Sequence, residues 1–196
     1  MSDTEQLLDD ASRGDPAAIE ALLVKQIPAI DAYVRLRAGR LVRAKESTSD
    51  VVQSVCREAL EHMDRFEFRG EAQFRHWLCQ HALHKILNKK RFYTAERRDA
   101  ARELGRQTIA GKSQNNLAEC YASICTPSQV ASGKEDLEAF EAAFSELPED
   151  YGRVITLHRL VGLPFNEIGP LMDRSEGAAR NLFNRAVAKL ATMLDD

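Results

Sequence analysis

The sequence lacks any long hydrophobic run, and this absence sets the first limit on what the protein can be. No stretch approaches the ~20 consecutive apolar residues that a membrane-spanning helix needs, so we expect no membrane insertion. The amino-terminal segment MSDTEQLLDDASRGD is acidic and lacks the basic-then-apolar order of a secretion signal. We therefore expect a cytoplasmic protein.

Cysteine is scarce and follows no spaced pattern. The chain has only Cys56, Cys79, Cys120 and Cys125. Scattered cysteines in a cytosolic chain are expected to be reduced thiols rather than a disulfide framework. No neighbouring residue marks any of them as unusually reactive.

Metal-binding and catalytic motifs are absent as well. His76, Gln80 and His84 recur at four-residue intervals, but glutamine is a poor zinc ligand and no four-ligand set emerges. The chain has no Gly-rich phosphate loop, no paired-carboxylate motif and no nucleophile paired with a base. We expect no metal, no cofactor and no catalytic residue, and hence no enzyme.

Charge is nearly balanced overall but unevenly distributed. The net charge is −3, yet residues 85–106 hold eight Lys or Arg against three acids, a local charge of +5. Residues 174–189 hold four bases against one acid, a local charge of +3, while acids gather at 1–20 and 134–150. Two basic patches on an acidic chain favour two nucleic-acid-facing surfaces, with acidic faces left for a protein partner.

Helical periodicity is present through most of the chain, whereas no segment alternates with the period of a strand. A helix is expected to begin at Asp15-Pro16, and Pro28 is expected to divide it from the next one. Another helix should open at residues 47–49 and bury a broad apolar stripe that includes Leu60. A fourth should run from 72 to 92. The sequence therefore predicts an all-α fold.

The periodicity fades in the middle of the chain. Between residues 96 and 133 Arg, Gln, Asn, Ser and Gly dominate, which is typical of a linker. We predict two small helical domains, residues 1–95 and 134–196, joined by a flexible linker at 96–133.

The second domain contains the most informative pattern. Residues 147–190 read as a helix, a short helix, a tight turn and a longer basic helix, which is the layout of a DNA-binding helix-turn-helix. Ser175 is placed to cap the basic helix. Proline lacks an amide donor, so Gly169-Pro170 predicts a short or kinked helix before the turn.

The polar face of the basic helix is a candidate duplex-reading site. Arginine and lysine suit phosphates and guanine edges, and asparagine suits adenine. A merely solvated face is the alternative, but the preceding short helix and turn favour DNA. Of these residues, we expect Arg180 and Arg185 to make the main contacts with DNA. The candidate set is Ser175, Arg180, Asn181, Asn184, Arg185 and Lys189.

Taken together, these motifs resemble a bacterial RNA polymerase sigma factor of the small extracytoplasmic-function (ECF) type. SDVVQSVCREAL (49–60) is similar to the family's Asp-x-x-Gln helix, which binds the clamp coiled coil of the polymerase. RHWLCQHALHKILNKKR (75–91) resembles the family's promoter-melting helix, and residues 147–186 follow its carboxy-terminal pattern. His84 and Asn88 stand where the family often has Asn and Asp, so promoter contacts do not transfer directly.

The resemblance implies two further sites. Asp50, Gln53 and Arg57 would contact core RNA polymerase, with a salt-bridged surface as the alternative. The promoter-melting helix and the preceding 66–73 segment, similar to the family's base-capturing loop, would hold the opened strand. The candidates for that strand are Phe68, Arg69, His81, His84, Lys85, Asn88, Lys89 and Arg91.

One alternative and one further expectation concern the strand site. Phe66 and Phe68 could pack beneath the helix instead of facing DNA. The face that carries His81 and Lys85 is expected to lie opposite Trp77.

The resemblance implies a sigma factor that directs core RNA polymerase to specific promoters and initiates transcription. Its partners would be core RNA polymerase and promoter DNA, and an anti-sigma protein is a further candidate because family members are commonly held inactive by one. The alternative is an autonomous helix-turn-helix regulator that binds operator DNA as a dimer. An enzyme with a DNA-binding tail has no motif to support it.

Overall fold

Helices form all the regular secondary structure in residues 3–99, 119–122, 124 and 134–195, which are the residues that this computed structural model describes. The chain divides into two compact units, Met1–Lys112 and Ser113–Asp196, and the division falls inside the segment predicted as a linker. Within the described residues there is no strand, and the all-α prediction is confirmed.

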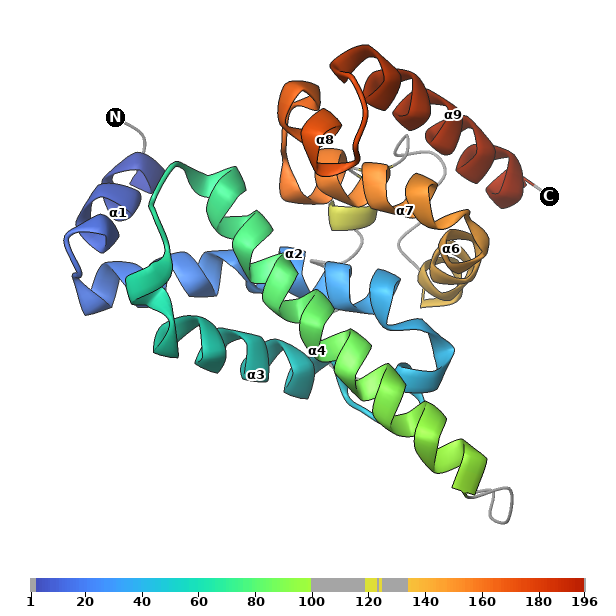
Figure 1. The fold of residues 1–196 in the computed structure, drawn as a ribbon, viewed down its shortest axis with the longest axis horizontal. Helices are drawn as coiled ribbons and strands as arrows, with labels where there is room; N and C mark the ends of the chain where they lie inside the picture. The colour runs from blue at the N-terminus through green and yellow to red at the C-terminus, as the bar shows by residue number, and fades with distance from the viewer. Residues whose placement is uncertain (1–2, 100–118, 123, 125–133, 196) are drawn as a thin grey trace. The chain divides into compact units, whose positions relative to one another are not determined.

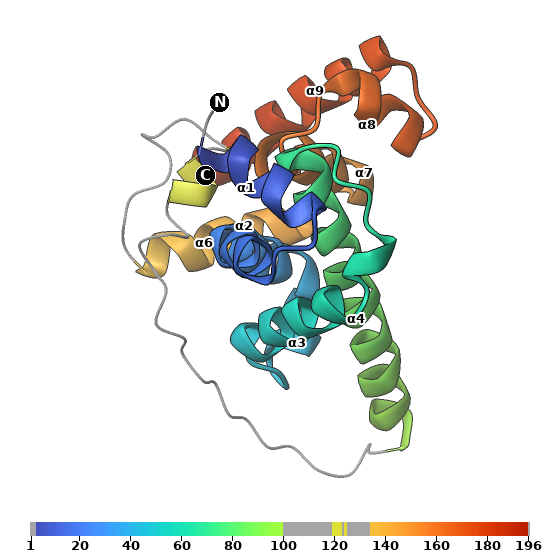
Figure 2. The same cartoon turned by 90° about the vertical axis from the view of Figure 1, so that its left-hand side faces the viewer.

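The amino-terminal unit is built around α2. In chain order its elements are α1 (Asp3–Ser12), α2 (Pro16–Arg43), α3 (Thr48–Glu61), a 3₁₀ turn (Met63–Arg65) and α4 (Glu71–Asp99). Helix α2 contacts α1, α3 and α4, and α3 packs against α4, as Figures 1 and 2 show. The apolar residues that recur at helical spacing face inward, and burying each large one stabilises the fold by about 1.5–3 kcal/mol. The fully buried ones include Leu22, Ile30, Val55, Phe74, Leu78 and Ile86.

Two helix predictions differ from the structure here. The helix α2 continues through Pro28, and its backbone departs from helical geometry only at Gly39 (φ 66°, ψ 170°). Pro28 removes only the hydrogen bond to the carbonyl of Val24, a 58% exposed residue, while Leu22 and Ile30 bury the helix on either side. The prediction of a break at Pro28 is therefore wrong. Helix α1, which packs on α2, was not predicted.

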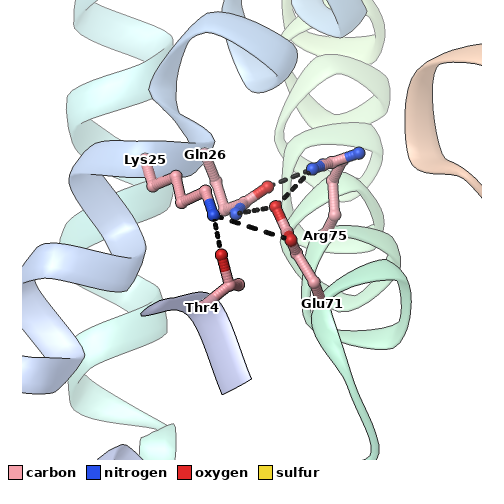
Figure 3. A network of polar contacts seen from close by, with 5 residues as sticks. All are labelled: Thr4, Lys25, Gln26, Glu71 and Arg75. Atoms are coloured by element: carbon pink, nitrogen blue, oxygen red, sulfur yellow. Dashed lines mark hydrogen bonds and ion pairs between the residues drawn. The ribbon is translucent and has the colours of Figure 1, made fainter. Parts of the chain in front are cut away.

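A polar network joins α1, α2 and the start of α4 (Figure 3). Gln26 is fully buried, yet both ends of its amide are bonded: it accepts from Arg75 Nε at 2.6 Å and donates to Glu71 at 3.2 Å. Arg75 also donates to Glu71 at 2.8 Å, and Lys25 links Glu71 to Thr4. Because a buried amide is costly unless satisfied, this network fixes where α4 begins.

The carboxy-terminal unit consists of short helices packed on one long helix. These are α6 (Lys134–Glu146), α7 (Glu149–Ile155), a π-helical turn (Thr156–Val161), α8 (Phe165–Leu171) and α9 (Glu176–Asp195). Helix α9 contacts α6, α7 and α8. Figure 1 shows α8, a turn and α9 in succession, the arrangement expected of a helix-turn-helix.

Part of the segment predicted as a linker belongs to this core. Tyr121 is fully buried, stacks on Phe140 with ring centroids 4.7 Å apart, and donates to Glu141 at 2.9 Å. Ile124 is buried beside it in sequence. Two apolar residues in a polar segment carry too weak a periodic signal to predict this docking.

Gly169 explains the unusual Gly169-Pro170 pair. A Cβ atom at Gly169 would lie 2.8 Å from the carbonyl oxygen of Arg174, closer than carbon and oxygen can approach. The glycine carbonyl in turn accepts the Arg174 amide at 2.9 Å, which closes the turn. Helix α8 is seven residues long, with Pro170 in its last turn, so it is short as expected.

Candidate nucleic-acid interfaces

The candidate duplex-reading surface is the solvent-facing side of α9. One stripe of the helix is buried and consists of Ala179, Leu182, Phe183, Ala186 and Leu190. Every residue of the candidate duplex set lies off this stripe and is exposed: Ser175, Arg180, Asn181, Asn184, Arg185 and Lys189. The surface therefore has the exposure that a major-groove contact requires.

The amino-terminus of α9 is capped as the sequence predicts. The Ser175 hydroxyl accepts the amide of Ala178 at 3.2 Å, and the Ser175 carbonyl accepts the amide of Ala179 at 2.9 Å. Asp173 takes a left-handed conformation (φ 54°), which reverses the chain between α8 and α9. The start of α9 is thus held in a defined direction.

Arg180 is held by two neighbours in the carboxy-terminal unit. Its guanidinium donates to Glu176 at 2.8 Å, and its Cζ lies 5.5 Å from the centre of the Phe165 ring. Arg180 and Glu176 remain 58% and 52% exposed. An exposed ion pair of this kind contributes little to stability, so its main effect is to limit the directions in which Arg180 points.

An aromatic cluster beneath Arg180 was not predicted. His158 stacks on Phe165 at 4.2 Å and meets Phe183 edge-on at 4.8 Å. The His158 Nδ1 lies 3.0 Å from the carbonyl of Leu163, which holds the ring in place. Only tertiary packing brings these residues to Arg180, and no local sequence signal marks them.

The candidate strand site on α4 is crossed by ion pairs from other elements. Lys85 Nζ lies 2.5 Å from Glu58, and Lys89 Nζ lies 2.5 Å from Glu46. His81 Nδ1 lies 3.1 Å from Glu58. Two of the expected phosphate-binding lysines therefore already contact carboxylates.

These contacts lower the pKa of both carboxyl groups. Hydrogen bonding to Lys85 lowers the pKa of Glu58, partly opposed by burial, and His81 adds to the effect. Burial alone would raise the pKa of Glu46, but hydrogen bonds to Lys89 and Tyr93 outweigh it and lower the pKa. Both side chains are therefore anionic at neutral pH.

The expectation that this face lies opposite Trp77 is wrong. The His81 ring meets the Trp77 ring edge-on with centroids 4.6 Å apart. Residues four apart lie above one another on a helix, so Trp77, His81, Lys85 and Lys89 form one row. The remaining α4 candidates, His84, Asn88 and Arg91, are exposed.

The segment before α4 presents one aromatic and one cationic candidate. Phe68 is half-buried and packs edge-on against Phe66 at 4.9 Å, and Phe66 in turn contacts Trp77 at 5.1 Å. Arg69 is 73% exposed. Gly70 (φ 125°) then leads into α4 in a conformation that favours glycine. Both phenylalanines are half-buried and pack against Phe74, so the packing alternative accounts for part of each side chain.

The candidate polymerase-binding face on α3 is a single exposed stripe. Asp50, Gln53 and Arg57 are all exposed, and their spacing places them on one side of the helix. Leu60 continues this stripe and is 54% exposed, although the sequence pattern predicted it to be buried. An exposed leucine beside polar groups gives the face an apolar contact point.

The cysteines do not form a reactive site in the described part of the chain. Burial raises the pKa of the Cys79 thiol to about 12 and also raises the pKa of Cys56. Both are protonated at neutral pH and therefore poor nucleophiles. Cys120 is in no disulfide, and Cys125 lies outside the described residues.

Neither a metal cluster nor a membrane helix is found among the residues that the structure covers. No group of three or more His, Cys, Asp or Glu side chains there could hold a metal ion. None of the helices there has the length and apolar character needed to cross a membrane.

Comparison with known proteins shows which proteins this chain resembles. The family model for sigma-70 region 4 matches residues 137–190, a range that includes the exposed face of α9. The ECF RNA polymerase sigma factor SigD of Mycobacterium tuberculosis is 26% identical over 186 residues, covering 95% of this chain and 81% of SigD. The ECF RNA polymerase sigma-E factor of Haemophilus influenzae is 29% identical, covering 93% of each chain. The chain is thus similar to ECF RNA polymerase sigma factors over more than nine-tenths of its length.

The fold also has a counterpart among solved structures. The sigma factor RpoE of Bartonella quintana, solved in complex with the anti-sigma factor NepR, matches with a TM-score of 0.60 at 19% identity. The match covers 90% of this chain and 96% of RpoE. At this identity the likeness shows the shared fold.

Proposed function

We infer that this protein is a promoter-specificity subunit, which directs core RNA polymerase to specific promoters and initiates transcription. The observation that carries this conclusion is the similarity to ECF RNA polymerase sigma factors over 93–96% of the chain. The region 4 match over residues 137–190 adds a DNA-binding element to it. The exposed polar face of α9 supports this role.

We assign three surfaces to this function. The α9 face reads duplex DNA of the minus-thirty-five element, because its amides and cations are exposed where a major groove admits a helix. Helix α4 with Phe68 and Arg69 holds the opened minus-ten strand, for which aromatic and cationic groups are suited. The α3 stripe of Asp50, Gln53 and Arg57 docks on the polymerase.

The role requires no chemistry from this chain. RNA synthesis belongs to the polymerase, so the protein acts in the cytoplasm as a non-enzymatic binding subunit.

The relative from Bartonella quintana is bound by the anti-sigma factor NepR. By analogy, an anti-sigma protein that covers the same surfaces is a candidate partner here. Nothing in the comparisons favours an autonomous operator-binding dimer.

We predict that specific promoter binding depends on core polymerase. The two DNA-facing surfaces lie in separate units of an acidic chain, so the isolated protein should bind promoter DNA weakly and with strong salt sensitivity. Fluorescence anisotropy with a labelled promoter fragment measures this, with and without core enzyme. Tight, symmetric operator binding by the protein alone would favour the regulator instead.

We further predict that Asp50→Ala with Gln53→Ala weakens core-polymerase binding. Each interfacial hydrogen bond contributes about 0.5–1.5 kcal/mol, so losing two should cost roughly tenfold in affinity. Both side chains are exposed, so helical content should not change. A pull-down titration with core enzyme gives the affinity.

The matched control for the docking variant is Gln6→Ala with Glu20→Ala. It removes one amide and one carboxylate from exposed positions of α1 and α2. Unchanged polymerase affinity in the α3 variant, or an equal loss in the control, would contradict the assignment of the α3 stripe.

A further inference from the structure

Two carboxylates outside α4 form ion pairs with two lysines of the candidate strand site, Lys85 and Lys89. Glu58, on α3, contacts Lys85 at 2.5 Å and His81 at 3.1 Å. Glu46, in the connection between α2 and α3, contacts Lys89 at 2.5 Å and accepts a hydrogen bond from Tyr93. Neither carboxylate lies in the helix that carries the candidate strand residues of α4.

The geometry gives each carboxylate the position that a nucleic-acid phosphate would take. Lys85 is 22% exposed and Lys89 is 31% exposed, so solvent still reaches both. A phosphate approaching either ammonium group must displace the carboxylate or settle beside a second anion. Displacement breaks an existing ion pair, and proximity adds repulsion. Both outcomes weaken strand binding.

We propose that Glu46 and Glu58 are affinity-determining residues of the strand site, where they bind its lysines in place of phosphates and weaken sequence-independent binding of single-stranded nucleic acid. The inference rests on the proposed function, because it takes α4 as the surface that meets the opened strand. Phosphate contacts by Lys and Arg provide most of non-specific nucleic-acid affinity. Ion pairing of two such lysines within the protein therefore reduces binding of the isolated subunit to the large excess of non-specific nucleic-acid sites.

A purely structural role for the ion pairs predicts the opposite effect of removing the carboxylates on the affinity for single-stranded DNA. If the pairs only fastened α3 and the α2–α3 connection to α4, removing the carboxylates would loosen the unit and could not strengthen strand binding. If they compete with phosphates, the same change strengthens it. The direction of the affinity change therefore separates the two.

The test is Glu46→Gln with Glu58→Gln in the full-length protein, titrated against a fluorescein-labelled single-stranded oligothymidine at several salt concentrations. Glutamine keeps the shape and a hydrogen-bonding oxygen but removes the charge. We expect roughly twofold to fivefold tighter binding per released lysine at low salt. The plot of log affinity against log salt should steepen by up to about 0.7 per lysine.

Two controls isolate the local effect. Glu20→Gln with Glu61→Gln changes the net charge equally at exposed positions of α2 and α3, and should leave the salt slope unchanged. The second control adds Glu46→Gln and Glu58→Gln to a protein that already carries Lys85→Ala and Lys89→Ala. Here the glutamines should not tighten oligothymidine binding, because no lysine remains to be released. Circular dichroism checks that each variant folds.

The inference is overturned if the folded double variant binds the oligothymidine no more tightly than wild type, or if the control pair gains as much. If the double variant fails to fold, Glu46→Gln and Glu58→Gln are tested singly, and each must bind the oligothymidine more tightly than wild type. Run-off transcription by the wild-type protein with core polymerase is measured in parallel. If the wild-type protein supports transcription but the variants do not bind the oligothymidine more tightly, this inference is refuted and the proposed function stands. If the variants bind more tightly but the wild-type protein does not support transcription, the proposed function is refuted.

Discussion

Replacing Arg180 with alanine is expected to weaken binding of the polymerase complex to its promoter by about 1–3 kcal/mol and to relax base preference at one position of the upstream element. The side chain is exposed on α9, and Glu176 and Phe165 limit its directions. A bidentate contact to guanine would account for a loss of this size. Equilibrium binding to promoters that vary one base pair at a time measures both effects.

Lys189→Ala is the comparison variant for Arg180→Ala. Lys189 is exposed on the same helix, and a lysine that contacts only phosphate should weaken all sequences alike and reduce the salt slope by about 1. If Arg180→Ala weakens every promoter variant uniformly, Arg180 is a phosphate contact and the base-reading assignment fails.

Lys85→Ala with Lys89→Ala is expected to impair promoter opening, with a smaller effect on duplex binding. Both lysines lie on α4, where the proposal places the opened strand, so their loss removes cations that hold unpaired DNA. Permanganate reactivity of promoter thymines reports strand opening. A template with a pre-melted bubble should restore much of the lost activity, because the unfavourable opening step has been removed.

Arg180→Ala provides the contrast for the lysine variant. A pre-melted bubble should not rescue it, since its defect precedes opening. Normal permanganate reactivity in the lysine variant, or equal rescue of both variants by the bubble, would contradict the division between a duplex-reading α9 and a strand-holding α4. Helical content is checked in parallel, because the change leaves Glu58 and Glu46 without their lysine partners.

The helical fold was predictable because apolar residues with a 3.6-residue period decide which face of each helix is buried. Ile30, Val55 and Phe74 followed this rule. Leu60 is exposed although it was predicted to be buried, because spacing alone does not distinguish a residue at the edge of the apolar stripe from one at its centre. Pro28 does not break α2, because the local cost of a proline is smaller than the stabilisation from tertiary packing on either side of it.

The α9 face was the most predictable part of the site. Its polar residues lie off a regular apolar stripe, and their exposure follows from that pattern. The ion pairs on α4 could not be predicted in this way. His81 and Glu58 are 23 residues apart in the chain, and Tyr93 and Glu46 are 47 apart, so only the packing of α3 and of the α2–α3 connection against α4 brings them together.

Run-off transcription with purified core RNA polymerase tests the central claim most directly. The template is sheared genomic DNA of the source organism, and the 5′ ends of the transcripts are mapped by sequencing. With this protein added, transcripts should start at a limited set of sites that share two upstream sequence elements at constant spacing. Initiation no different from that of core enzyme alone would contradict the account.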